Sequence, residues 1–179
     1  MAGWSSLGCG LAAVLVVGII VAAGPASALL PEAPVGAGTA QSAAPELLLV
    51  DLEGVQHGLS EWRGQVLVVN FWASWCAPCQ AEIPQLVRLQ SEFGARGLQI
   101  IGVGIDAPRR LANVRRSLGI NYPVLIVEPE QAGRMLGDWG NARQFVPYTV
   151  VIDRDGRVAH RQFGELDREV FNEFIAPLL

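Results

Sequence analysis

Two cysteines three residues apart carry the clearest chemical signal in this chain of 179 residues. Cys76 and Cys79 follow an apolar, β-rich run and precede a helical pattern, so we expect them at a strand-to-helix junction. The free amides and positive potential of a helix's first turn favour the thiolate at Cys76, which is the expected nucleophile. Cys79, one turn further in, would attack a mixed disulfide formed on Cys76. The pair is therefore expected to cycle between dithiol and disulfide, with no cofactor besides these two sulfurs.

A zinc site is the main alternative for a Cys-x-x-Cys pair. Such a pair supplies half of a structural site, which needs two more Cys or His ligands. The rest of the chain offers only Cys9, His57 and His160, and Cys9 lies in an apolar leader. The strand before the pair and the helix after it favour thiol chemistry, so we expect no metal ligand among these residues.

The distribution of charge argues against a nucleic-acid partner. The formal net charge is −4, and all 13 basic residues are arginines. They are scattered along the chain, and the densest group, between Arg109 and Arg116, is typical of a solvated helix face. We therefore expect no nucleic acid among the partners.

The N-terminal segment predicts export or anchoring in a membrane. Residues 7–23 carry no charge and are about long enough, at the short end, to cross a bilayer as a helix. The Ala26-Ser27-Ala28 that follows has the small-x-small form of a signal peptidase site. We interpret residues 1–28 as a signal peptide or an uncleaved membrane anchor, and the length of the apolar stretch favours the anchor. Residues 29–45, rich in Ala, Pro and Gly, are then a flexible linker to a folded domain over residues 46–179.

Both interpretations place the domain outside the cytoplasm, in a bacterial periplasm or on an extracytoplasmic face, where an anchor would tether it to the inner membrane. An oxidising compartment drives an unprotected Cys-x-x-Cys pair to the disulfide. A reductant that works there must be recharged, so we expect a membrane thiol-disulfide donor among the partners.

The domain alternates strand and helix patterns before it ends in a hairpin and a helix. This order predicts an α/β fold in which a mixed sheet carries helices on both faces. The apolar run over residues 65–72 is typical of a central strand, and Asp167 is the expected N-cap of the last helix. We expect a short hairpin over 47–52 and 57–59, and strands over 65–72, 98–105, 123–127, 148–152 and 158–163. We expect one helix that starts at the cysteine pair and continues after Cys79 to about Gly94, and further helices over 108–118, 129–136 and 167–178.

Three blocks of the domain resemble a known protein family. They are the run from Asn70 to Cys79, the Glu82-Ile83-Pro84 after it, and the run from Val146 to Gly156. Together they resemble the TlpA and ResA type of membrane-tethered, thioredoxin-like thiol-disulfide oxidoreductases, over essentially residues 46–179. The resemblance implies a thioredoxin-like fold, which is a central mixed β-sheet flanked by helices, with an N-terminal β-hairpin and a central insertion between Leu98 and Gly140.

The resemblance also implies roles for single residues. Pro147 matches the family's cis-proline, and the backbone of Val146 before it would pair with an extended substrate segment. An ordinary trans proline at a strand edge is the alternative. Glu82 matches a helix glutamate of the family, which partial burial would equip to exchange protons with the Cys79 thiol. The alternative for Glu82 is a surface acid.

Two neighbours of the motif bear on the same site. Asn70 stands where thioredoxin itself has a buried acid, and it cannot titrate, which shifts proton transfer toward Glu82 or water. Trp75 adjoins Cys76 and is expected at the surface, as part of a substrate-facing wall. Core packing is the competing interpretation for this tryptophan.

From these residues we expect an extracytoplasmic enzyme that reduces protein disulfides through Cys76 and Cys79. The resemblance implies the cysteines of apocytochrome c or of copper sites as targets, and so a role in cytochrome c maturation or copper-site assembly. A Cu(I)-binding module that uses the same cysteines without turnover is the alternative, although a third ligand is not evident. A peroxide-reducing enzyme is a weaker alternative.

Overall fold

The computed structural model describes residues 42–179, so the predicted leader, Cys9 and residues 29–41 of the predicted linker lie outside the described residues. The described part begins with main-chain contacts to the domain. The amide of Val158 donates to the carbonyl of Ser42 (2.9 Å), and the amide of Ala44 donates to the carbonyl of Gly156 (3.0 Å). Residues 42 and 44, which the sequence assigns to the linker, therefore make main-chain hydrogen bonds to the domain. Over residues 42–179, no helix has both the length and the apolar character that crossing a membrane requires.

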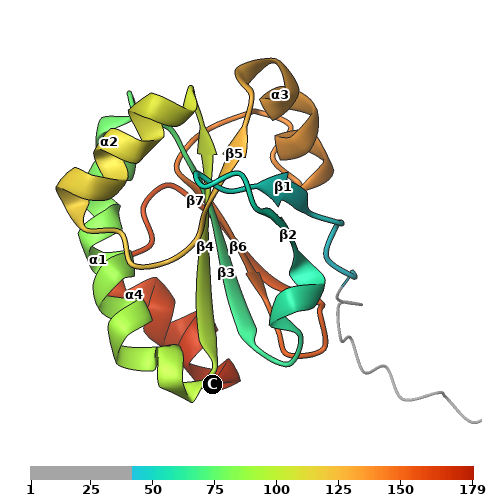
Figure 1. The fold of residues 1–179 in the computed structure, drawn as a ribbon. Helices are drawn as coiled ribbons and strands as arrows, with labels where there is room; N and C mark the ends of the chain where they lie inside the picture. The colour runs from blue at the N-terminus through green and yellow to red at the C-terminus, as the bar shows by residue number, and fades with distance from the viewer. Residues whose placement is uncertain (1–41) are drawn as a thin grey trace, which may run out of the picture. The chain divides into compact units, whose positions relative to one another are not determined.

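A five-stranded mixed sheet forms the centre of the domain, as predicted (Figure 1). Its middle strand is β3 (Val66–Trp72), and all seven of its residues are buried. β3 pairs in parallel with β4 (Leu98–Ile105) and antiparallel with β6 (Tyr148–Ile152). The outer strands are β5 (Val124–Val127), parallel to β4, and β7 (Val158–Phe163), antiparallel to β6. The predicted N-terminal hairpin forms a separate two-stranded sheet of β1 (Leu48–Val50) and β2 (Gln56–Gly58), followed by a short 3-10 helix over Leu59–Trp62.

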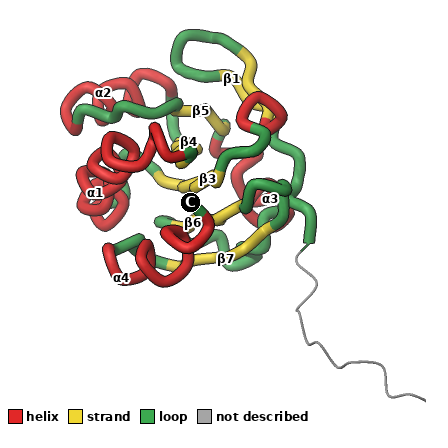
Figure 2. The backbone as a smooth tube through the Cα atoms, turned by 90° about the horizontal axis from the view of Figure 1, so that it is seen from below, coloured by secondary structure: helices red, strands yellow, loops and turns green. Residues whose placement is uncertain are grey.

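Helices cover both faces of the sheet, which divides the apolar core into two layers (Figure 2). Alternate residues of a strand point to opposite faces, so Val68 and Trp72 enter one layer while Val69 and Phe71 enter the other. The first layer packs under α1 (Ala77–Phe93), α2 (Pro108–Leu118) and the C-terminal helical segment, and the second under α3 (Pro129–Asp138) and the β1–β2 hairpin. A 3-10 turn over Gly94–Arg96 joins α1 to β4.

The predicted last helix forms, but its hydrogen-bond pattern changes along its length. Asp167 caps it as expected, because its carboxylate accepts from the amides of Glu169 and Val170, both at 2.9 Å. A turn of α-helix, α4 (Arg168–Val170), is followed by a π-helical turn over Phe171–Ile175 and a 3-10 turn over Ala176–Leu178. Pro177 has no amide hydrogen for the carbonyl of Glu173, so a regular α-helical ladder cannot continue to the C-terminus.

One arginine makes hydrogen bonds to three separated segments at the end of the sheet where β4 begins and β6 ends. The guanidinium of Arg154 donates to the carbonyl oxygens of Gly64 (2.9 Å) and Arg96 (3.1 Å). It also donates to the main-chain oxygens of Leu178 (3.2 Å) and Leu179 (2.9 Å). A planar side chain with several fixed N–H groups is suited to serve four main-chain oxygens at once.

We expect Arg154→Ala to lower the free energy of unfolding by about 1–3 kcal/mol, because four main-chain oxygens lose a charged donor at a partly solvated site. Arg154→Lys should recover little, since one ammonium cannot span the same acceptors. Arg157→Ala, at an exposed arginine in the same turn, serves as the matched control and should change stability by less than about 0.5 kcal/mol. Urea denaturation measures all three, and equal stability of the Arg154 and Arg157 alanine variants would contradict this assignment.

Candidate active site

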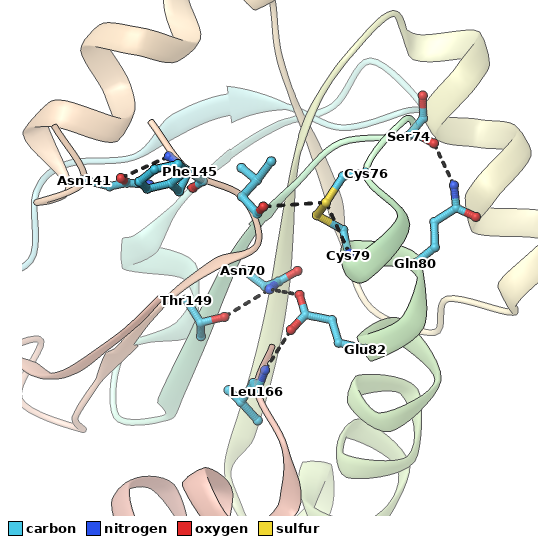
Figure 3. Close-up of a disulfide and its surroundings, with 11 residues drawn as sticks. Asn70, Ser74, Cys76, Cys79, Gln80, Glu82, Asn141, Phe145, Thr149 and Leu166 are labelled. Carbon is cyan, nitrogen blue, oxygen red and sulfur yellow. Dashed lines mark hydrogen bonds between the residues drawn. A yellow bond between two sulfur atoms is a disulfide. The ribbon is translucent and has the colours of Figure 1, made fainter. Parts of the chain in front are cut away.

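A disulfide joins Cys76 and Cys79 where β3 ends and α1 begins (Figure 3). The two sulfurs are 2.06 Å apart and the two Cα atoms 5.2 Å apart. Cys76 is 5% exposed and Cys79 is fully buried, so the order of accessibility is the predicted one. A partner molecule can therefore reach the disulfide only from the side of Cys76.

Cys76 is the N-cap residue of α1. Its Sγ accepts from the amide of Cys79 at 3.2 Å, and its carbonyl accepts from the amide of Gln80 at 3.1 Å. The helix begins at Ala77, so Cys76 lies at its first turn as predicted: the sulfur takes the place of a capping oxygen, and Pro78 suits the first turn. The positive end of α1 and the Cys79 amide together favour negative charge at this sulfur.

The loop that precedes β6 faces the disulfide. The Val146–Pro147 peptide bond is cis, which confirms the prediction for this proline. The carbonyl oxygen of Val146 lies 3.7 Å from the Sγ of Cys76. A disulfide sulfur has no hydrogen, so this is a contact in the oxidised protein, whereas a Cys76 thiol would be able to donate to the same oxygen.

A buried asparagine that the sequence analysis missed holds this loop. The side-chain Nδ2 of Asn141 donates to the carbonyl of Phe145 (2.7 Å), and its Oδ1 accepts from the amide of Phe145 (3.3 Å). Nothing in the residue type of Asn141 distinguishes it from an ordinary loop asparagine.

Two exposed aromatic side chains flank the disulfide. The Phe145 side chain is 60% exposed, and Trp75 next to Cys76 is 69% exposed, which excludes core packing for Trp75. Phe145 adjoins Val146, so the aromatic side chains next to both Cys76 and Val146 remain open to a partner.

Glu82 is buried beneath the disulfide and not at the surface. The carboxylate is 3% exposed, and it accepts from the Nδ2 of Asn70 (2.7 Å) and from the amide of Leu166 (2.9 Å). Burial raises the pKa of Glu82 to about 7, and these two hydrogen bonds only partly oppose that rise. A carboxyl group with such a pKa exchanges a proton readily near neutral pH.

Asn70 connects this carboxylate to the sheet. Its Nδ2 also donates to the Oγ1 of Thr149 at 3.0 Å, across the β3–β6 pair. Asn70 thus joins the acid supplied by α1 to β6, the strand that pairs with β3. The roles of Thr149 and Leu166 are not predictable from the sequence, because they depend on contacts between segments more than 75 residues apart.

The described residues contain no group of three or more His, Cys, Asp or Glu side chains placed to hold a metal ion. Both histidines make other contacts. The ring of His57 is held between the carboxylates of Asp51 (3.0 Å) and Glu61 (2.8 Å), and that of His160 stacks on Phe174 at 3.8 Å between ring centroids.

Burial of Glu82 predicts a pH-dependent stability. Its pKa is about 7 in the folded protein, against 4.5 for an ordinary glutamate, so the folded state binds the extra proton between these values. The stabilisation is complete below pH 4.5 and is lost as the pH rises through about 7, which amounts to about 3 kcal/mol. We expect Glu82→Gln to remove this part of the pH dependence.

Urea denaturation of the oxidised protein at a series of pH values from 4.5 to 8 measures the effect. Glu173→Gln, which changes an exposed glutamate of the C-terminal segment, should keep the wild-type pH dependence. A Glu82→Gln variant whose stability falls with pH as steeply as that of the wild type would contradict the burial argument.

Comparisons with known proteins agree with this geometry. The model of the AhpC/TSA family matches residues 40–161. The thiol-disulfide oxidoreductase ResA of Geobacillus thermodenitrificans is 31% identical over 138 residues, which cover 76% of each chain. The thiol:disulfide interchange protein HelX of Rhodobacter capsulatus is 40% identical over 118 residues, which cover 65% of this chain and 62% of that protein.

Solved structures give the same picture. A thiol:disulfide interchange protein of Chlorobium tepidum superposes with a TM-score of 0.68 at 27% identity, over 77% of this chain and 96% of that one. A secreted thiol-disulfide isomerase of Corynebacterium glutamicum has a TM-score of 0.71 at 24% identity, over 82% of this chain and 94% of that one. The second likeness bears on the fold alone, which is thioredoxin-like.

Proposed function

We propose that this chain, which belongs to the AhpC/TSA family and is a thiol-disulfide oxidoreductase, works outside the cytoplasm as a reductant of protein disulfides. The observation that carries the proposal is the Cys76–Cys79 disulfide at the start of α1, with only Cys76 accessible and a buried carboxylate one turn after Cys79. The resemblance to the TlpA and ResA type favours the cysteines of apocytochrome c or of copper sites as targets.

The first step uses Cys76 as the nucleophile. In the reduced protein, the start of α1 and the Cys79 amide stabilise the Cys76 thiolate. This thiolate attacks one sulfur of the substrate disulfide, so that a bond forms from Cys76 to that sulfur and the substrate's S–S bond breaks. The departing substrate thiolate takes a proton from solvent. The product is a mixed disulfide between Cys76 and the substrate.

The second step uses Cys79 and Glu82. Residues three apart on a helix share a face, which places the Glu82 carboxylate on the same side of α1 as the Cys79 thiol. The carboxylate accepts the thiol proton, and the Cys79 thiolate attacks the Sγ of Cys76. The mixed disulfide breaks, and the second substrate sulfur leaves as a thiolate that is then protonated. The substrate has gained two electrons and two protons, and the enzyme carries the Cys76–Cys79 disulfide seen in the structure.

The remaining parts of the proposal concern what surrounds the two cysteines. The main chain of Val146 aligns an extended substrate segment, and the exposed rings of Trp75 and Phe145 contact its apolar side chains. A membrane thiol-disulfide donor returns two electrons and two protons to the cysteines after each turnover. Residues 1–28 direct the domain to the extracytoplasmic side, as an anchor or a signal.

We expect Cys76→Ser to reduce disulfide turnover by more than about 100-fold, because serine is neither a thiolate nor able to form a mixed disulfide. Cys79→Ser should instead retain the first step and accumulate the mixed disulfide on Cys76. Insulin reduction followed by mass spectrometry measures both. Cys9→Ser is the matched control with unchanged turnover.

The same preparation separates the alternatives. Persistent turnover by Cys76→Ser would end the proposal. A reduced wild-type protein that binds Cu(I) tightly with one-to-one stoichiometry and reduces no disulfide would favour the copper module. A reduction potential near the oxidising end of the thioredoxin-like range, about −120 mV, would contradict the reducing direction.

We also expect Glu82→Gln to slow the second step by about tenfold or more, since a glutamine side chain accepts no proton from Cys79. The wild-type rate of release should follow a titration near pH 7, and the variant should lack it. Rapid-quench kinetics separate release from capture, and capture by Cys79→Ser should not change when Glu82→Gln is added. Equal slowing of both steps would contradict a role confined to Cys79.

A further inference from the structure

The turn that leads from β3 to Cys76 is held by polar contacts from two other elements. The hydroxyl of Ser74 donates to the Oδ2 of Asp106, the residue after the end of β4. The Nε2 of Gln80, in α1, donates to the carbonyl of Ser74 at 2.7 Å (Figure 3). The hydroxyl of Ser74 is therefore fixed by the residue that follows β4, and its carbonyl is fixed by the helix that Cys76 caps.

Asp106 is a buried hydrogen-bond acceptor that its neighbours hold in place. The residue is 5% exposed, and its second oxygen accepts from the amide of Ala107 (2.7 Å) and from the guanidinium of Arg110 (3.4 Å). Burial raises the pKa of Asp106, but the hydrogen bonds from Ser74 and Ala107, together with the charge and hydrogen bond of Arg110, outweigh it and hold the pKa below its ordinary value. The carboxylate is therefore ionised at neutral pH, and a hydrogen bond to an ionised acceptor is among the stronger ones in proteins.

The oxidised and the reduced protein depend to different degrees on contacts that hold the turn before Cys76. In the oxidised protein the S–S bond itself keeps Cys76 against Cys79. Reduction removes that covalent link, yet attack on a substrate requires the Cys76 sulfur to stay at the cap position, near the Cys79 amide. Trp75, the only residue between Ser74 and Cys76, is 69% exposed and adds little packing to hold the turn.

We propose that Asp106 and Gln80, acting through Ser74, are positioning residues that keep the sulfur of reduced Cys76 within hydrogen-bond reach of the first amides of α1. None of the three needs to touch the substrate. The inference rests on the proposed role of Cys76 as the attacking thiol, and it adds the contacts that keep this thiol competent once the disulfide has opened.

The test is the alkylation of the reduced full-length protein by iodoacetamide as a function of pH, with each modified cysteine identified by mass spectrometry. We expect Ser74→Ala to lower the rate at Cys76 about fivefold at pH values below the thiol pKa, the equivalent of one lost N-cap interaction. The apparent pKa of the Cys76 thiol should rise accordingly. Ser74→Thr keeps the hydroxyl and should restore both quantities to wild-type values.

Two further variants keep the outcome decisive. Gln80→Ala removes the second contact from a partly exposed position of α1 and should move the Cys76 thiol pKa in the same direction. Ser91→Ala removes a hydroxyl from the exposed side of the same helix, where it donates to the carbonyl of Val87 and accepts from the Nδ2 of Asn121, and should move neither quantity.

The failures are distinguishable. If Cys79 is alkylated before Cys76 in the wild type, the proposed function itself fails. If Cys76 reacts first, but Ser74→Ala and Gln80→Ala lower only the free energy of unfolding and leave the thiol pKa and the alkylation rate unchanged, the contacts are merely structural and the inference alone is overturned.

Discussion

The structure depends on holding one sulfur atom at the start of a helix. A thiolate at the Cys76 position is stabilised by a hydrogen bond from the amide of Cys79 and by the positive potential at the start of α1. Both interactions are lost if the sulfur moves by a fraction of a helical turn. Only a rigid support keeps such a position. β3 provides it, because all seven of its residues are buried between two apolar layers and it pairs with a strand on each side.

The second constraint is the placement of an acid in the apolar layer beneath that sulfur. Burial of Glu82 opposes its ionisation, and the main-chain amide of Leu166 and the amide group of Asn70 make ionisation possible within the physiological range. The carboxylate thereby connects α1, β3 and the segment before α4, three parts of the chain that also define the disulfide's surroundings. The Glu82 carboxylate therefore serves both as a proton acceptor and as a contact that holds these three segments together.

Local signals in the sequence predicted most of the fold. Strands β4, β6 and β7 and helix α2 have the expected bounds, because Pro108, Gly119 and the turn about Gly156 mark their ends. The cysteine pair likewise marked the start of α1, whereas the irregular hydrogen bonding of the C-terminal segment, which reflects Pro177, was not predicted.

The site was predictable to a different degree. The motif itself led to Cys76 and Cys79, and the family resemblance added Glu82 and the cis bond at Pro147. The partners that fix these groups were not predictable from the sequence. Asp106 and Asn141 are polar residues of common type in loops, and their importance arises from burial and from neighbours that the chain brings together only on folding.

The direction in which the chain joins its sheet has a consequence for any attachment at the N-terminus. Ser42 pairs beside the first residue of β7, at the end of the sheet where β6 finishes, whereas the disulfide lies beyond the last residue of β3. β6 is antiparallel to β3 and separates these two ends by its five residues, roughly 17 Å. The main chain therefore enters the described domain at the end of the sheet opposite the disulfide, so a protein that docks at Cys76 meets the end of the domain that lies away from Ser42.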